Sequence, residues 1–187
     1  MSGPAAALAA ELRDTTEDDL PDIRDIYTHH VLHSLATFEE EVPSLDEMAR
    51  RFADTKAEGL PHLVAATAEG VAGFAYARRY HPRPGYRFSV ENSVYIRPGL
   101  ERRGLGRRLM TALIDRCGAL GCRQMIAVVG VGEDQASVGL HKALGFREVG
   151  TLRSVGCKFG RWVDTVTLQR PLGEGDESLP PAQPNQA

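Results

Sequence analysis

The sequence has few cysteines and no long apolar run, and both absences exclude classes of protein. Its three cysteines, Cys117, Cys122 and Cys157, leave one without a partner and lack the spacing of metal ligands. We therefore expect reduced thiols and a cytoplasmic protein. No apolar run reaches the ~18 residues of a membrane span, and the amino terminus lacks the basic start of a signal peptide. We expect no membrane partner.

Net charge is also small. A value of −3 over 187 residues gives no reason to expect nucleic acid as a partner. Arginines cluster between Arg97 and Arg108, which favours one small anionic ligand over a polyanion. With 42% hydrophobic and 25% charged residues, the chain should form one globular domain. We predict this domain over residues 12–172, between a flexible tail at 1–11 and a disordered tail at 173–187.

One stretch predicts a strand, a glycine turn and a helix in succession. The β-branched and aromatic residues at 90–96 favour a strand, which the Pro-Gly pair at 98–99 ends. Over residues 105–117 the apolar positions recur every four residues, as in an amphipathic helix. Gly104 and Gly106 lie where this helix begins.

This glycine turn is suited to an anion. First-turn N–H groups of a helix lack intrahelical acceptors, and glycines let a ligand approach the backbone, so phosphate or pyrophosphate is the expected guest. The turn does not match the Walker loop, which needs Gly-Lys-Ser or Gly-Lys-Thr, and it does not match the dinucleotide fingerprint, because residues 107–109 supply no third glycine. An ordinary solvated loop is the alternative.

The remaining chain predicts alternating strands and helices, which favours an α/β class. We predict strands at residues 12–14, 62–68, 71–79, 124–129, 147–155 and 164–172. We predict helices that begin near Thr16, that run from the cap Ser44 to Glu58, and that span residues 134–144.

Four segments, in order and spacing, resemble the GNAT superfamily of acyl-CoA-dependent N-acetyltransferases, and within it the phosphinothricin and methionine sulfoximine acetyltransferase family. These are residues 90–96, the glycine turn at 104–106, residues 140–146 and residues 156–164. Agreement of several motifs is more specific than any one. The resemblance implies a GNAT fold, that is, a mixed central sheet with splayed parallel strands flanked by helices. It also implies a homodimer and acetyl-CoA as co-substrate.

Glu91 is the candidate general base. A carboxylate in a poorly charged strand is either an edge residue in water or a functional group near a pocket, and the resemblance favours function. An acceptor ammonium must lose a proton before its nitrogen attacks a thioester, and an unperturbed carboxylate is a weak base for this, so we expect Glu91 to act through water or in a perturbed environment. His141 stands near where many GNAT enzymes protonate the leaving thiolate. General acid, substrate contact and a surface histidine are the alternatives for it.

The resemblance implies that acetyl-CoA lies along residues 94–96 and the glycine turn, with strand amides holding the acetyl carbonyl. Simple alternation would send Ser93 and Tyr95 to one face and Val94 and Ile96 to the other. Glu101 and Asp134 depart from the family's usual residues, and a carboxylate near pyrophosphate is unfavourable. The candidate cofactor-binding residues are Val94, Tyr95, Ile96, Arg102, Arg103, Gly104, Leu105, Gly106, Arg107, Asp134 and Ser137.

Residues 80–86 form the candidate acceptor loop. Its prolines and glycine cannot continue a strand, and it is dense in aromatic, His and Arg side chains. By resemblance Arg83 meets a carboxylate or phosphinate; a solvated arginine is the alternative. The candidate substrate-binding residues are Phe38, His81, Pro82, Arg83, Tyr86, Phe88 and Lys158.

The histidines His29, His30 and His33 suggest a metal site, but we expect none. Zinc catalysis would need a glutamate base inside the motif and a further ligand, and neither is evident.

The function that the resemblance implies is transfer of an acetyl group from acetyl-CoA to the amine of a small amino-acid-like acceptor, of the phosphinothricin or methionine sulfoximine type. Another amine, such as a polyamine or a protein amino terminus, stays open because fold does not decide function. The acidic run at residues 39–41 would favour a cationic acceptor. A non-catalytic acyl-CoA sensor and a phosphate-binding module unrelated to CoA are the remaining alternatives.

Overall fold

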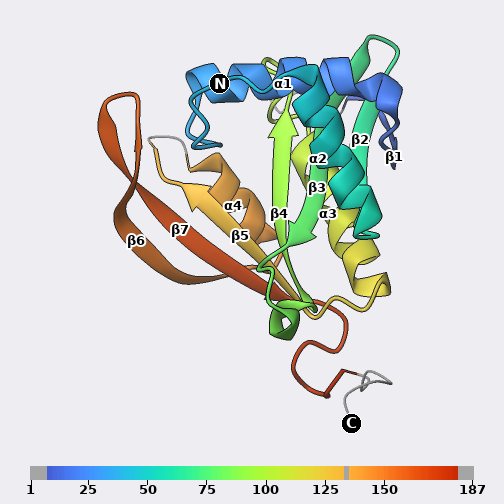
Figure 1. Cartoon of the computed structure of the whole chain (residues 1–187), viewed down its shortest axis with the longest axis vertical. Helices are drawn as coiled ribbons and strands as arrows, with labels where there is room; N and C mark the ends of the chain where they lie inside the picture. Colours follow the sequence, from blue (N-terminus) through green and yellow to red (C-terminus); the bar gives the residue numbers. More distant parts are fainter. Residues whose placement is uncertain (1–7, 133–134, 181–187) are drawn as a thin grey trace.

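The computed structural model describes residues 8–132 and 135–180. Its core is a seven-stranded mixed sheet in the order β1-β2-β3-β4-β5-β7-β6 (Figure 1). The strands are β1 (Glu11–Asp14), β2 (His62–Thr67), β3 (Gly70–Arg79), β4 (Ser89–Ile96), β5 (Gln124–Gly130), β6 (Arg147–Lys158) and β7 (Arg161–Pro171). The α-helices of the described part are α1 (Leu20–His33), α2 (Leu45–Ala57), α3 (Leu105–Ala119) and α4 (Ala136–Ala143). The predicted α/β fold with flanking helices is confirmed.

The parallel pair β4–β5 separates soon after it forms. Pairing runs only from Ser89 opposite Gln124 to Glu91 opposite Ile126. β5 continues along β7 as far as Gly130, so β5 does not end where it leaves β4. Beyond Glu91 the two strands diverge and leave a wedge between them (Figure 1). The predicted splay is therefore confirmed.

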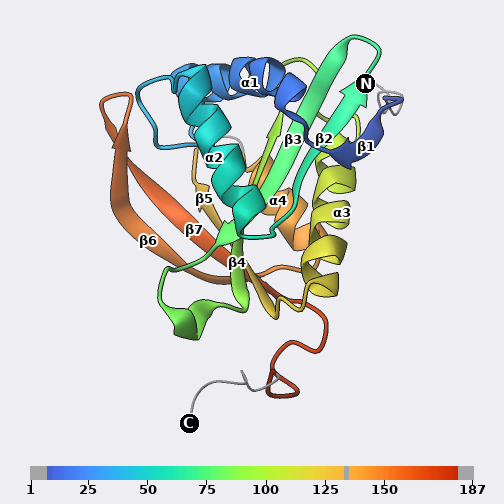
Figure 2. The ribbon, with the colours of Figure 1, turned by 45° about the vertical axis from the view of Figure 1, so that its right-hand side comes forward.

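Two helical layers cover the two faces of the sheet. Helices α1 and α2 pack on one face, where Ile23 and Phe52 meet Phe74 of β3. Helices α3 and α4 cover the other, where Leu109 and Leu113 lie in a second core cluster (Figure 2). The alternation predicted for β4 is confirmed, because Tyr95 belongs to the first cluster and Val94 and Ile96 pack against the second.

The helix starts follow local sequence. The Ser44 hydroxyl accepts the Glu47 N–H at 3.1 Å, so the predicted cap of α2 is confirmed. Gly104, with φ of 81°, is the N-cap of α3. A side chain there would be strained, since this left-handed region favours glycine.

The β6–β7 hairpin is longer than the sequence indicated. We predicted strands ending at residue 155 and beginning at 164, but β6 reaches Lys158 and β7 begins at Arg161. The turn is only Phe159-Gly160, with φ of 53° and 69°, and two left-handed residues make the tight turn that matches the twist of antiparallel strands.

Two further observations concern the segment that follows β7 and the apolar character of the helices. Residues 173–178 form turns and bends, and Arg123 Nη1 lies 3.2 Å from Ser178 Oγ and 3.4 Å from the Gly175 carbonyl. Within the described ranges, no helix is both long enough and apolar enough to cross a bilayer.

Candidate active site

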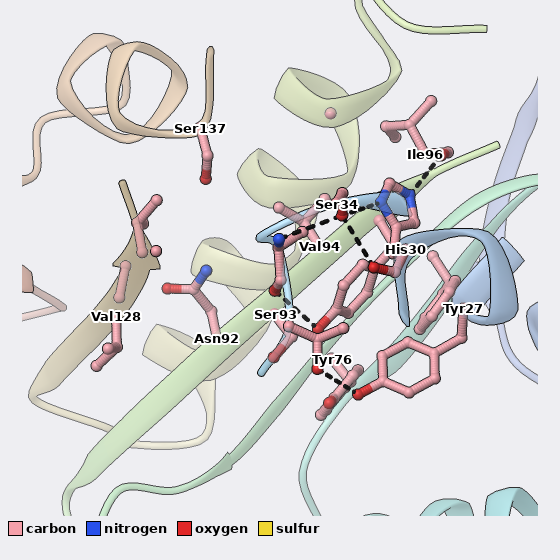
Figure 3. A pocket seen from close by; sticks show the side chains of 18 of the residues that line it. Tyr27, His30, Ser34, Tyr76, Asn92, Ser93, Val94, Ile96, Val128 and Ser137 are labelled. Carbon is pink, nitrogen blue, oxygen red and sulfur yellow. Dashed lines mark hydrogen bonds between the residues drawn. The ribbon is translucent and has the colours of Figure 1, made fainter. Parts of the chain in front are cut away.

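A cleft of about 1840 Å³ opens where β4 and β5 separate. One wall carries aromatic side chains of α1 and β3, the floor is β4 from Glu91 to Ile96, and the other wall is formed by β5, α4 and the start of α3. Figure 3 shows side chains from these elements converging on the gap. The splay of two strands thus creates the site.

The start of α3 forms an anion cradle at the open end of this gap. The first intrahelical bond is donated by the Arg108 N–H to the Gly104 carbonyl, so the N–H groups of Leu105, Gly106 and Arg107 have no acceptor inside the helix. A Cβ at Gly106 would lie 3.2 Å from the Leu140 side chain, so a larger residue here would crowd Leu140. The predicted residues that line the cleft here are Arg102, Gly104, Gly106 and Arg107.

Two strand amides face the gap. The Arg97 N–H donates to the Ala72 carbonyl of β3 at 2.9 Å, so alternation directs the Tyr95 amide to β3 and the Val94 and Ile96 amides toward the gap. The Ile96 carbonyl lies 3.0 Å from His30 Nε2 on the same edge (Figure 3). Val94 and Ile96 therefore offer their N–H groups where β5 has moved away.

Glu91 lines the cleft beside a guanidinium. Its Oε1 lies 2.7 Å from Arg78 Nη2, and its side chain is only 17% exposed. The two residues are direct cross-strand partners on β4 and β3. Arg78 was not predicted from the sequence. A charged residue near the end of a strand is expected to face water, and its contact with Glu91 follows only from the register of the two strands.

The wall opposite the cradle is aromatic. The Tyr27 hydroxyl lies 2.9 Å from Thr37 Oγ1, and the rings of Phe74 and Tyr95 stack 5.1 Å apart. Burial raises the pKa of Tyr27 to about 12 and also raises that of Tyr95, so both phenols stay protonated at neutral pH. Tyr27 and Tyr76 were not predicted as site residues, since aromatics at helix or strand spacing resemble core.

Phe38 and Lys158 were both predicted to bind substrate, but only Phe38 lines the cleft. Phe38 lines the cleft, and its ring fills the space above Gly156, where a Cβ would lie 2.2 Å from Phe38 Cε1. Lys158 is 1% exposed and is not among the residues that line the cleft. Its ammonium donates to the carbonyls of Ser34 at 2.9 Å and Thr37 at 2.6 Å. Lys158 thus holds the connection that carries Phe38.

The predicted acceptor loop borders a second, smaller hollow of about 540 Å³. His81, Pro82 and Arg83 line it, and the two hollows share Arg78 and Glu58. Two other predicted substrate-binding residues, Tyr86 of the loop and the nearby Phe88, line neither hollow. The Tyr86 ring packs 4.9 Å from His81, and the Phe88 ring lies under Arg87. Arg78 therefore connects the loop to the cleft.

His141 of α4 lines the cleft but is almost fully buried, at 2% exposure. Its Nδ1 is 2.7 Å from the Ser137 carbonyl and so must carry the proton, while Nε2 is 2.9 Å from Asn92 Nδ2 and accepts. Burial lowers the pKa of His141, which keeps the ring neutral. In this arrangement neither nitrogen presents a proton to the cleft. Asn92 was not predicted as a site residue.

The histidines of the HHxxH segment line the cleft. The rings of His29 and His33 are 5.0 Å apart, and within residues 8–132 and 135–180 no group of three or more metal-ligand side chains is found. The three cysteines are free. Arg103 does not line the cleft, and the Leu105 side chain is buried in the core. Asp134 falls outside the described residues.

Free N–H groups at a helix start, strand amides without a strand partner among the described residues, and a carboxylate in the gap of a splayed pair are the arrangement of an acyltransferase-type site. A family model described as an acetyltransferase (GNAT) domain matches residues 12–167. The chain belongs to this family.

Two relatives and a solved structure agree with this family assignment. The chain is 50% identical to phosphinothricin N-acetyltransferase of Alcaligenes faecalis, over 94% of this chain and 89% of that one. It is 41% identical to L-methionine sulfoximine/L-methionine sulfone acetyltransferase of Pseudomonas aeruginosa, over 87% and 94%. A GNAT phosphinothricin acetyltransferase from Sinorhizobium meliloti, crystallised with acetyl-CoA, superposes with a TM-score of 0.89 at 46% identity, over 93% and 94%.

Proposed function

We propose that this enzyme transfers the acetyl group of acetyl-CoA to the primary amine of a small amino-acid-like acceptor, of the phosphinothricin or methionine sulfoximine type. One observation carries the proposal: the same cleft joins the start of α3 at Gly104 and Gly106 to the Glu91 carboxylate, along a strand edge whose amides have no strand partner in the described ranges. The names of the relatives support the acceptor class.

The donor's pyrophosphate would occupy the start of α3. Free N–H groups and the positive end of the helix dipole favour it, and Arg102 and Arg107 add charge. The acyl arm would then run along β4. The N–H groups of Val94 and Ile96 would hold carbonyl oxygens of the arm and stabilise the oxyanion that forms during transfer. Ser137 lines the far wall.

The transfer itself needs one base. The acceptor ammonium gives a proton to Glu91 through a water molecule, and the freed nitrogen attacks the thioester carbonyl carbon. The C–N bond forms as the carbonyl electrons move to oxygen. When the C=O bond re-forms, the C–S bond breaks, the nitrogen loses its second proton, and the thiolate takes that proton. The products are the N-acetyl compound, the CoA thiol and one released proton. Fixing the amine against the thioester supplies much of the acceleration.

The acceptor's acidic groups would lie at the junction of the two hollows. Arg78 faces Glu91 there, and Arg83 lies across the smaller hollow. Guanidinium groups bind carboxylates and phosphinates through paired donors. The acidic run expected to attract a cation is partly neutralised, because Glu39 is 2.7 Å from Arg51. This favours an amino-acid acceptor over a polyamine.

We also propose a homodimer through the β6–β7 hairpin, in the reducing cytoplasm that free thiols favour. The hairpin projects from the sheet (Figure 1) and exposes five large apolar side chains. These are Val149, Leu152, Val155, Phe159 and Trp162. An exposed apolar edge of this kind is normally covered. Sedimentation of Trp162→Glu against wild type tests it: equal sedimentation coefficients would contradict this interface.

The acceptor proposal is tested by free-thiol release from acetyl-CoA with phosphinothricin, methionine sulfoximine, ordinary amino acids and polyamines. We expect turnover of the first two, and Glu91→Gln should lower kcat by roughly 10²–10⁴-fold while acetyl-CoA binding persists. Glu69→Gln, at the exposed β2–β3 turn, is the matched control. Acetyl-CoA binding with no acceptor turned over would refute the acceptor class, and full activity of Glu91→Gln would refute the base.

A further inference from the structure

Asn92 has one hydrogen-bonding atom left over inside the gap. It lies on β4 beside Glu91, is 6% exposed, and its side chain points from β4 toward Val128 of β5 (Figure 3). Its Nδ2 lies 2.9 Å from His141 Nε2 and 3.6 Å from Met110 Sδ. Its Oδ1 is buried without a hydrogen-bond partner among the described residues.

The orientation of this amide follows from its neighbours. Because His141 donates from Nδ1 to the Ser137 carbonyl, its Nε2 can only accept, and Nδ2 of Asn92 must face it. Both N–H bonds of the amide are then used, on His141 and on Met110. The atom without a partner among the described residues is therefore the amide oxygen Oδ1, which is a hydrogen-bond acceptor. It cannot stabilise an oxyanion or protonate a thiolate, but it can accept an N–H.

Asn92 is among the residues that line the cleft, so a ligand in the gap lies beside its side chain. Asn92 shares its face of β4 with Val94 and Ile96, which is the face toward α3. The anion cradle opens on the same side, since a Cβ at Gly106 would lie 4.0 Å from the Ile96 side chain. A donor anchored at the cradle and extended along β4 passes Ile96 and Val94 before it comes to Asn92. A buried carbonyl oxygen without a partner is unfavourable, and such a ligand would satisfy it.

We propose that Asn92 Oδ1 accepts a hydrogen bond from an N–H group of the bound ligand, and that His141 is the positioning residue that keeps this oxygen aimed into the gap. The inference rests on the proposed function and deepens it. Two sources carry the required N–H: the secondary amides in the arm of acetyl-CoA, and the amine of the acceptor.

The first experiment compares wild type with Asn92→Leu, which is similar in shape and has no polar atom, by calorimetric titration with acetyl-CoA and by acceptor KM. Loss of one hydrogen bond should weaken the ligand that supplies the N–H about fivefold to tenfold. A raised acetyl-CoA Kd assigns it to the arm; a raised acceptor KM at unchanged Kd assigns it to the amine. Thr165→Val on β7 removes a buried hydroxyl that also lacks a partner among the described residues but does not line the cleft, so it is the matched control and should change neither. If Asn92→Leu changes neither, the inference is wrong.

The second experiment tests the positioning role of His141. His141→Phe keeps a ring against Phe146, 4.9 Å away, but cannot accept from Asn92, so the same ligand should weaken about as much as in Asn92→Leu. His141→Gln provides an acceptor oxygen and should restore binding. A loss equal in both His141 variants would refute positioning, because a purely structural role would not distinguish them.

A third measurement needs no variant and therefore does not depend on folding. An acetyl-CoA analogue with an ester oxygen in place of the amide N–H nearest the thioester should bind wild type about fivefold to tenfold more weakly, if the arm supplies the hydrogen bond. Equal affinity, together with an unchanged acceptor KM in Asn92→Leu, would overturn the inference. Failure of wild type to bind acetyl-CoA at all would instead refute the proposed function.

Discussion

The protein should lose stability in mild acid because of one half-buried histidine in an aromatic stack. His62 of β2 stacks on Tyr76 at 5.1 Å and on Phe74 at 6.0 Å, and its Nδ1 lies 2.8 Å from Thr15 Oγ1. The edge of Phe52 closes the stack at 5.3 Å. Burial lowers the pKa of His62 from 6.5 to about 4, so the folded protein holds this ring neutral.

The sign and size follow from linkage. Because the pKa is lower in the folded state, the unfolded chain takes up the proton first, and stability falls as pH drops from about 6.5 toward about 4. At about 1.4 kcal/mol per pH unit, the interval between the two pKa values corresponds to about 3 kcal/mol. About 2 kcal/mol of this should already be lost by pH 5.

The assay is urea unfolding at pH 7 and pH 5 for wild type and His62→Phe, whose ring keeps the stack without titrating. Burial also lowers the pKa of His30 and His141, but these residues are present in both proteins. Wild type should therefore lose about 2 kcal/mol more than the variant between the two pH values. An equal loss in both proteins would refute the assignment to His62.

Three further substitutions test residues that hold the site in place. Gly156→Ala should displace the Phe38 ring, lower stability by about 1–3 kcal/mol in urea unfolding and raise acceptor KM, whereas Gly150→Ala on the same strand, with open space, should do neither. Lys158→Met should lower stability by about 2–3 kcal/mol and raise acceptor KM without changing the acetyl-CoA Kd; an unchanged KM would contradict its role in holding the loop. Gly104→Ala, at φ of 81°, should lower thermal stability by about 1–2 kcal/mol, and an unaltered Tm would contradict strain there.

Local features of this fold could be predicted because neighbours along the chain decide them. The Ser44 cap and the periodic apolar face of α3 depend on residues within a few positions, so their helices were predicted close to their observed limits. The glycine turn was recognised for the same reason. The β6–β7 turn was missed, because Phe159 has a positive φ that its residue type does not favour.

The candidate site depends on contacts between distant residues. Glu91 was predicted as a site residue from the sequence, but the side chain opposite it, Arg78, follows only from strand register. His141 was identified as a site candidate, but its partner Asn92 is 49 positions away. Lys158 was expected to contact substrate, and instead its ammonium is buried against a loop more than 120 positions earlier.

The sequence by itself determined the elements, the glycine cradle and the family, because propensity, periodicity and motif spacing are properties of the chain. Only the tertiary structure decided which polar atoms are used and which are left free. The departure of β5 from β4 leaves the Val94 and Ile96 amides without a strand partner among the described residues, and the packing of α4 turns the Asn92 oxygen into the gap. A hydrogen bond depends on distance and direction in space, and neither is encoded by position along the chain.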